Sequence, residues 1–272
     1  RITSFSSLKS GLPFEMPDYD SQETTDETPA TESILSFPTG TRSGICIHQI
    51  FQALDFTAPG DLETLVSRKL NEHGFSEAYV PAVCAMVENA LNTNLDGIGL
   101  LNTVALKDRL DELEFYYPLK EITPNAIDAV FRKHNVAGLA SNPPGQIGRL
   151  RFEPVQGFMK GFVDSIIRRG DRFYIVDWKS NLLGNSPGDY TREAMRQSVL
   201  MRYYHLQYHI YALALHRYLQ RRLPGYDYER HFGGVYYIFL RGLDPARPDL
   251  GIFFDRPGGA LMNEFDKLLI PG

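Results

Sequence analysis

Apolar residues recur at helical spacing along much of the chain. Residues 43–56 are predicted to form an amphipathic helix, and His48 stands beside its apolar stripe. Residues 201–222 are predicted to form a longer helix, in which tyrosines repeat every three or four positions. Further helices are expected at 61–73, at 76–92, and from a cap at Thr123 or Asn125 to about 136.

Two β-rich runs, residues 161–167 and 172–179, are predicted to form an antiparallel hairpin with the four intervening residues as its loop. With that loop, Asp164, Asp177 and Lys179 share one face of the hairpin, because side chains alternate along a strand. The two carboxylates become diagonal neighbours about 7 Å apart. The prediction depends on loop length, since a shift of one residue turns a strand over.

An aromatic stretch at residues 113–119 is also strand-like, and Pro118 is expected to limit it. Residues 142–145, Asn-Pro-Pro-Gly, predict a loop. Strands mixed with amphipathic helices predict an α/β fold.

Composition identifies a folded globular protein. Of 272 residues, 43% are hydrophobic and 22% charged, which is outside the range of disordered chains. No apolar run approaches the roughly 20 residues that cross a bilayer, and no signal peptide opens the chain, so we expect no membrane partner. The two cysteines are too few for a disulfide framework, which favours the cytoplasm.

Charge is distributed unevenly. The net charge is −5, but residues 10–41 contain seven acids and no Lys or Arg, so the remaining residues carry +2. Residues 160–222 contain eleven Lys or Arg against five Asp or Glu, and this region could face phosphate. Ordinary solvation of helix faces is the alternative for any single basic residue.

These patterns divide the chain into four parts. Residues 1–9 begin the folded domain, and residues 10–41 are predicted to be an acidic flexible linker or loop. Residues 42–150 form a helical N-terminal part, and residues 151–272 hold the core with the hairpin and the helix that follows it. Because the chain opens on Arg1, we expect it to be a piece of a longer protein.

Two carboxylates that converge on a sheet face are costly to bury unless a cation compensates them. Mg²⁺ is the expected ion, and Mn²⁺ or Ca²⁺ could occupy the same oxygen-rich site. Lys179 could orient a water molecule or stabilise negative charge on a reacting phosphate. The alternative is a structural salt bridge between Lys179 and Asp164 or Asp177.

The long helix carries two polar pairs at i, i+4 spacing. Gln207 and Tyr211 could hold a phosphate, a nucleotide or the catalytic strand. His205 and His209 have the spacing of zinc ligands, but no third ligand is evident, so a solvated polar face is the expected reading.

Taken together, these motifs resemble the RecB family of the PD-(D/E)XK nuclease superfamily. The resemblance extends over nearly the whole chain and rests on Gly161-Phe162-Val163-Asp164, on Val176-Asp177-Trp178-Lys179-Ser180-Asn181, and on Gln207 with Tyr211. It implies a restriction-endonuclease-like α/β fold, with a mixed central sheet flanked by helices and a helical N-terminal region.

The resemblance also implies roles for individual residues. The metal ligands would be His48, Asp164, Asp177 and the backbone carbonyl of Trp178, with Lys179 as the catalytic lysine. A histidine beside an apolar stripe is otherwise more often a packed core residue. Glu114 matches an acidic position that the family often places near the metal, and Glu112 competes for it. Gln207 and Tyr211 would position DNA.

The implied activity is Mg²⁺-dependent hydrolysis of DNA, mainly from ends, in double-strand break repair and recombination. The implied partners are DNA, a helicase domain on the N-terminal side, RecC-like and RecD-like subunits and a RecA-like recombinase. The chain has no G-x-x-x-x-G-K-[ST] loop, so we expect no ATP site in it. A non-catalytic module that docks a partner is the alternative, and RNA remains a possible substrate.

Overall fold

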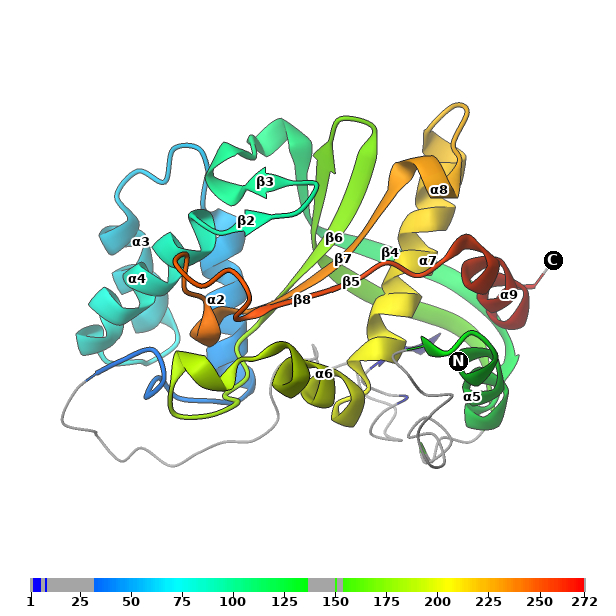
Figure 1. Cartoon of the computed structure of the whole chain (residues 1–272), viewed down its shortest axis with the longest axis horizontal. Helices are drawn as coiled ribbons and strands as arrows, with labels where there is room; N and C mark the ends of the chain where they lie inside the picture. Colours follow the sequence, from blue (N-terminus) through cyan, green and yellow to red (C-terminus); the bar gives the residue numbers. More distant parts are fainter. Residues whose placement is uncertain (1, 6–7, 9–31, 137–149, 151–153, 272) are drawn as a thin grey trace.

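The computed structural model describes residues 2–5, 8, 32–136, 150 and 154–271 (Figure 1). Its centre is a mixed sheet in the order β1-β5-β6-β7-β8, with β4 paired to β5. Neighbours are parallel in β1–β5 and β6–β7, and antiparallel in the other pairs. The strands are β1 (Ile2–Thr3), β4 (Arg109–Ile122), β5 (Val155–Arg169), β6 (Arg172–Lys179), β7 (Phe232–Phe239) and β8 (Ile252–Asp255).

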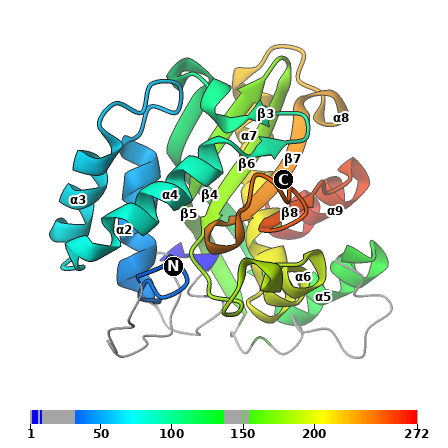
Figure 2. The same cartoon turned by 60° about the vertical axis from the view of Figure 1, so that its left-hand side comes forward.

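Helices cover both sides of this sheet (Figures 1 and 2). One apolar core packs α2 (Thr41–Ala53), α3 (Leu62–Glu72) and α4 (Val80–Leu91) against the sheet. The other core contains α5 (Pro124–Lys133), α6 (Arg192–Met201), α7 (Tyr204–Arg222) and α9 (Gly259–Leu269). The expected mixed sheet flanked by helices is therefore confirmed.

Shorter elements complete the description. A small hairpin pairs β2 (Asn94–Leu95) with β3 (Gly99–Leu100), and α8 (Tyr228–His231) precedes β7. Short 3₁₀ turns occupy Glu77–Tyr79, Leu101–Thr103, Leu106–Asp108, Pro187–Asp189 and Leu240–Gly242. No helix in the described part of the chain has the length and hydrophobicity needed to span a bilayer.

The β5–β6 hairpin forms as expected, but its predicted loop is wrong. Arg169 pairs with Arg172, so the turn has two residues, and Gly170 at its first position has φ 58°. A glycine is suited to this position because a two-residue hairpin turn needs positive φ there. The register moves by two residues, so the predicted faces survive while the diagonal pairing does not.

The strand predicted at residues 113–119 is longer than expected. Pro118 lies inside β4 and does not end it. Because β4 pairs only with β5 among the described strands, its free edge tolerates a residue without an N–H. The strand also belongs to the main sheet, so the 42–150 region supplies more than helices.

Most predicted helices are present. Residues 43–56, 61–73 and 201–222 correspond to α2, α3 and α7, and the predicted 76–92 helix is a 3₁₀ turn followed by α4. Thr123 caps α5 by accepting a hydrogen bond from the N–H of Ala126. Residues 10–31 of the acidic segment and the 142–145 loop lie outside the described residues.

The end of the acidic segment is held by a buried arginine. Arg241 donates hydrogen bonds to the carbonyl oxygens of Ile34, Phe37 and Pro38 at 2.6 to 2.8 Å. Its Nε donates to the carbonyl of Ser180 at 2.7 Å. The residues that lead into α2 are thus joined to those that follow β6.

Candidate active site

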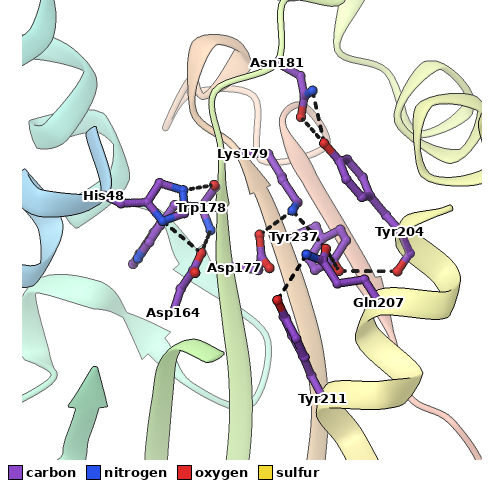
Figure 3. Close-up of polar contacts among 10 residues, drawn as sticks. All are labelled: His48, Asp164, Asp177, Trp178, Lys179, Asn181, Tyr204, Gln207, Tyr211 and Tyr237. Carbon is purple, nitrogen blue, oxygen red and sulfur yellow. Dashed lines mark hydrogen bonds and ion pairs between the residues drawn. The ribbon is translucent and has the colours of Figure 1, made fainter. Parts of the chain in front are cut away.

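The site lies where β5 and β6 separate (Figure 3). Their pairing ends at Ser165 and Val176, and beyond it the backbone N–H of Trp178 donates to Oδ2 of Asp164 at 3.0 Å. The Asp164 carboxylate therefore accepts the hydrogen bond that a backbone carbonyl of the neighbouring strand would otherwise accept. The same register, continued by one pair, places Asp164 opposite Asp177.

His48 reaches this point from α2. Its Nδ1 lies 3.3 Å from Oδ2 of Asp164, and its Nε2 lies 2.7 Å from the carbonyl oxygen of Trp178. The indole of Trp178 stacks on Phe51 of the same helix, with ring centroids 4.2 Å apart. This apolar contact fixes α2 against β6 and so brings His48 to the carboxylates.

Lys179 is buried at the end of β6. Its Nζ lies 2.7 Å from Oδ1 of Asp177 and donates to Oε1 of Gln207 at 3.1 Å. The ammonium also lies over the rings of Tyr204 and Tyr237, 3.9 and 4.5 Å from their centroids. Cation–π contacts and hydrogen bonds compensate the loss of hydration.

Hydrogen bonds at both the oxygen and the nitrogen of its side-chain amide orient Gln207. Its Oε1 accepts from the hydroxyl of Tyr237 at 2.5 Å, and its Nε2 donates to the hydroxyl of Tyr211 at 3.1 Å. The Gln207 amide thus contacts strand β6 through Lys179, which is one of the partners expected for it. A direct role in positioning DNA stays a prediction.

Tyr237 and Tyr204 were not anticipated as site residues. Tyr237 lies on β7 opposite Asp177, in a parallel pair. The apolar run at residues 235–240 could have predicted a buried parallel strand. Its alignment with β6 could not be read from the sequence, because a parallel pair has no short turn to set the register.

Two acidic residues of β4 were candidates for a position near the metal. Glu114 is exposed and forms an ion pair with Lys160 at 3.2 Å, and its role near a metal stays a prediction. Glu112 is also exposed and has φ 50°, a conformation that L-residues rarely adopt. Asp111 of the same strand is half-buried, and burial raises its pKa despite its ion pair with Arg109 at 2.8 Å.

Asp177, Asp164 and His48 each have an altered pKa. Burial, followed by the charge of Asp164, raises the pKa of Asp177 to about 7 despite Lys179. Burial also acts to raise the pKa of Asp164, but His48, Lys179 and the Trp178 N–H together outweigh it and lower that pKa. The two carboxylates similarly outweigh burial at His48 and raise its pKa.

The donor set suits a hard divalent cation. Asp164, Asp177 and the Trp178 carbonyl offer oxygen atoms, and His48 offers a nitrogen once it is neutral. Among the described residues, no group of three or more His, Cys, Asp or Glu side chains is already arranged around a metal position. Water and the backbone oxygen would therefore complete the coordination, as is usual for Mg²⁺.

The second pair of histidines lies in the apolar core, so the prediction of a solvated polar face is wrong. His205 and His209 are fully buried, and both pack against Phe131. Nδ1 of His209 bonds to the carbonyl of His205 at 2.6 Å. Burial lowers the pKa of each to about 4, so both are neutral at physiological pH.

The basic region at residues 160–222 is partly neutralised by acids outside it. Arg168 bonds to Asp108 at 2.6 Å, and Arg217 to Asp266 at 2.7 Å. These ion pairs reduce the charge that this region can present to phosphate.

Comparison with known sequences agrees with this fold. Residues 37–253 match the PD-(D/E)XK nuclease superfamily. The chain belongs to this superfamily, so the expected restriction-endonuclease-like fold is confirmed.

Within the superfamily, the chain is similar to proteins named RecBCD enzyme subunit RecB. It is 38% identical to the Escherichia coli (strain K12) protein over 234 residues, which is 85% of this chain and 19% of that protein. It is 34% identical to the Haemophilus influenzae protein over 257 residues, or 92% of this chain and 20% of that protein. The Mycolicibacterium smegmatis protein is 30% identical over 265 residues. The chain thus spans about a fifth of the length of these relatives.

Proposed function

We propose that this chain is a metal-dependent deoxyribonuclease domain that hydrolyses phosphodiester bonds of DNA with Mg²⁺. The observation that carries the proposal is the meeting of Asp164, Asp177, Lys179 and His48 where β5 and β6 separate. Stability alone does not explain this set of residues, because burying two carboxylates side by side costs free energy.

The residues that would hold the ion are Asp164, Asp177, His48 and the Trp178 carbonyl. A bound divalent ion stabilises charge on the phosphate and lowers the pKa of a coordinated water molecule. His48 must release its proton to coordinate, so metal binding should weaken as the pH falls. Mn²⁺ supports the same chemistry, and Ca²⁺ can occupy the oxygen ligands.

Lys179 would act on the reacting groups directly. Its ammonium is held by Asp177 and Gln207, so its orientation is set before substrate binds. A preoriented cation stabilises the charge that develops on the phosphate or orients the attacking water. Gln207, Tyr211 and Tyr237 act through Lys179 as positioning residues.

The names of the relatives support a proposal about the complex in which this chain acts. RecB is named as a subunit of the RecBCD enzyme. We propose that this chain is the cutting module of a similar cytoplasmic helicase–nuclease complex in double-strand break repair. It would act mainly from DNA ends, with endonuclease activity also possible. Its partners would be a helicase domain on its N-terminal side, RecC-like and RecD-like subunits and a RecA-like recombinase.

The direct test is cleavage of end-labelled single-stranded and duplex DNA by the 272-residue chain, with Mg²⁺ or with EDTA. We expect Mg²⁺-dependent products from the parent and none from Lys179→Ala. An RNA strand of the same sequence tests the alternative substrate. If the folded parent cuts nothing at any Mg²⁺ or Mn²⁺ concentration, the non-catalytic docking module becomes the better account.

A further inference from the structure

One face of the strands β1, β5 and β4 carries exposed aromatic and aliphatic side chains. Phe158 and Phe162 of β5 are 39% and 47% exposed, and Tyr116 of β4 and Ile2 of β1 are each 53% exposed. The register makes them neighbours, because Ile2 pairs with Phe158 and Tyr116 pairs with Lys160. Large apolar groups gathered on one exposed face usually mark a binding surface.

This face leads directly to the site. From Val155 to Asp164 the side chains of β5 alternate, with Val155, Met159 and Val163 buried in the core. The opposite positions are Phe158, Lys160, Phe162 and then Asp164. At about 3.3 Å per residue, Phe162 precedes the metal-ligand position by about 7 Å and Phe158 precedes it by about 20 Å.

The aromatic rings are arranged as flat platforms. Tyr116 and Phe158 stack across the two strands, with ring centroids 4.6 Å apart and planes 10° apart. Lys160 lies between them and Phe162, with its Nζ 5.6 Å from the Phe162 centroid and 3.2 Å from Glu114. Rings with an accessible face beside a cation suit a polymer with flat bases and a charged backbone.

We propose that Tyr116, Phe158 and Phe162 form a base-stacking track that guides single-stranded DNA to the site, without regard to sequence. The inference rests on the proposed nuclease function and adds the substrate form and the residues that select it. A single strand is favoured over a duplex because only unpaired bases expose their faces to stacking. Stacking also suits a chain with net charge −5, since it does not require a strongly basic surface.

The test measures binding of a fluorescent oligothymidine to the 272-residue chain in EDTA, where no cutting occurs. Each of Phe158→Ala and Phe162→Ala should weaken binding by about 5-fold to 100-fold, the range for loss of one stacked base. Phe162→Tyr should retain affinity, because it keeps the ring. In Mg²⁺, the alanine variants should raise KM on single strands and leave kcat unchanged.

Tyr218→Ala is the matched control. Tyr218 is 38% exposed and lies beside a cation, with Arg222 5.7 Å from its ring, but it is on α7 away from this face. A second probe is an oligonucleotide with abasic positions. The parent should bind it more weakly than oligothymidine, whereas the triple variant with Tyr116→Ala, Phe158→Ala and Phe162→Ala should bind both equally.

The outcomes separate this inference from the proposed function. If the parent cuts DNA but the alanine variants bind and cut like Tyr218→Ala, the track is wrong and the nuclease assignment stands. If the variants lose binding while the parent fails to cut with Mg²⁺, the track stands and the nuclease assignment fails. Equal binding of abasic and normal strands by the parent would also overturn the track.

Discussion

The two sides of the sheet hold histidines in different surroundings, with half-buried His48 on one side and fully buried His209 on the other. His48 on α2 faces two carboxylates, and their charges raise its pKa although burial acts to lower it. Nδ1 of His209 on α7 bonds to the backbone carbonyl of His205, and burial lowers the pKa of His209 to about 4. Neighbouring charges can therefore outweigh the effect of burial on whether a histidine keeps its proton.

The surroundings of these histidines differ from what their positions in the sequence indicate. His205 and His209 have the i, i+4 spacing of metal ligands, yet they are neutral core residues among Phe131 and Phe265. His48 stands alone beside an apolar stripe, yet it lies among the groups that suit a metal. A motif on one helix cannot show which strand the helix will pack against.

The largest expected effect is loss of cutting on replacing a carboxylate of the site. Asp177→Asn should reduce Mg²⁺-dependent DNA cleavage by about 10³-fold or more, because it removes a proposed ligand and the partner of Lys179. Cleavage rates at saturating DNA measure this. Circular dichroism should show a folded variant, and a cleavage rate equal to the parent's would falsify the assignment of Asp177.

The histidine pair should affect stability and not cutting. Their folded pKa of about 4 lies below the unfolded value of about 6.5, so the unfolded state binds more protons between these pH values. The contribution of each histidine to the free energy of unfolding therefore falls by up to about 3 kcal/mol as the pH falls from 6.5 to 4. Asp177 acts in the opposite direction between about pH 4 and 7, because its folded pKa is raised.

Comparison of variants separates these opposing effects. Urea unfolding of the parent and His209→Gln at pH 7 and pH 4 should show that the parent loses about 3 kcal/mol more than the variant. A pH dependence that is the same in both proteins would show that His209 is already protonated in the folded state.

A smaller effect is expected on metal binding. His48→Ala should weaken Mn²⁺ binding by about 10-fold to 100-fold in calorimetric titration at pH 7.5. His205→Gln is the matched control on the other side of the sheet and should bind Mn²⁺ like the parent. Equal affinities of His48→Ala and the parent would place His48 outside the site.

The smallest effect is expected from a positioning residue. Tyr237→Phe removes the hydroxyl that bonds to Gln207 and should lower kcat several-fold with KM unchanged, a cost of about 1 kcal/mol. Tyr236→Phe is its control, because it also removes a hydroxyl hydrogen bond, to the carbonyl oxygen of Asp96, but Tyr236 faces the other core. Equal losses in the two variants would indicate a general effect on β7 instead of an effect on Lys179.

Prediction from the sequence succeeded for features that depend on residues close together in the chain. Alternation along the hairpin placed Asp164, Asp177 and Lys179 together, and this survived a wrong loop because the error was two residues and kept the faces. Helix spacing and a cap residue likewise predicted α2 and α5. These signals come from neighbours in the chain.

What the sequence could not show depends on distant contacts. The helices α6 and α9 and the strands β7 and β8 were not predicted, and Tyr237 was missed with them. The positive φ of Glu112 within β4 was not predicted either. Trp178 was considered only for its carbonyl, although its ring anchors α2 through Phe51.

The guanidinium of Arg241 links two segments of the backbone beside the site by hydrogen bonds. It binds the carbonyls of Ile34, Phe37 and Pro38 on one side and that of Ser180 on the other, and Ser180 is bonded to Lys179 along the chain. Arginine stays charged at every physiological pH, so acid or base does not release this junction. The backbone at Ile34 to Pro38 is therefore linked through the Arg241 side chain to the residue that follows Lys179.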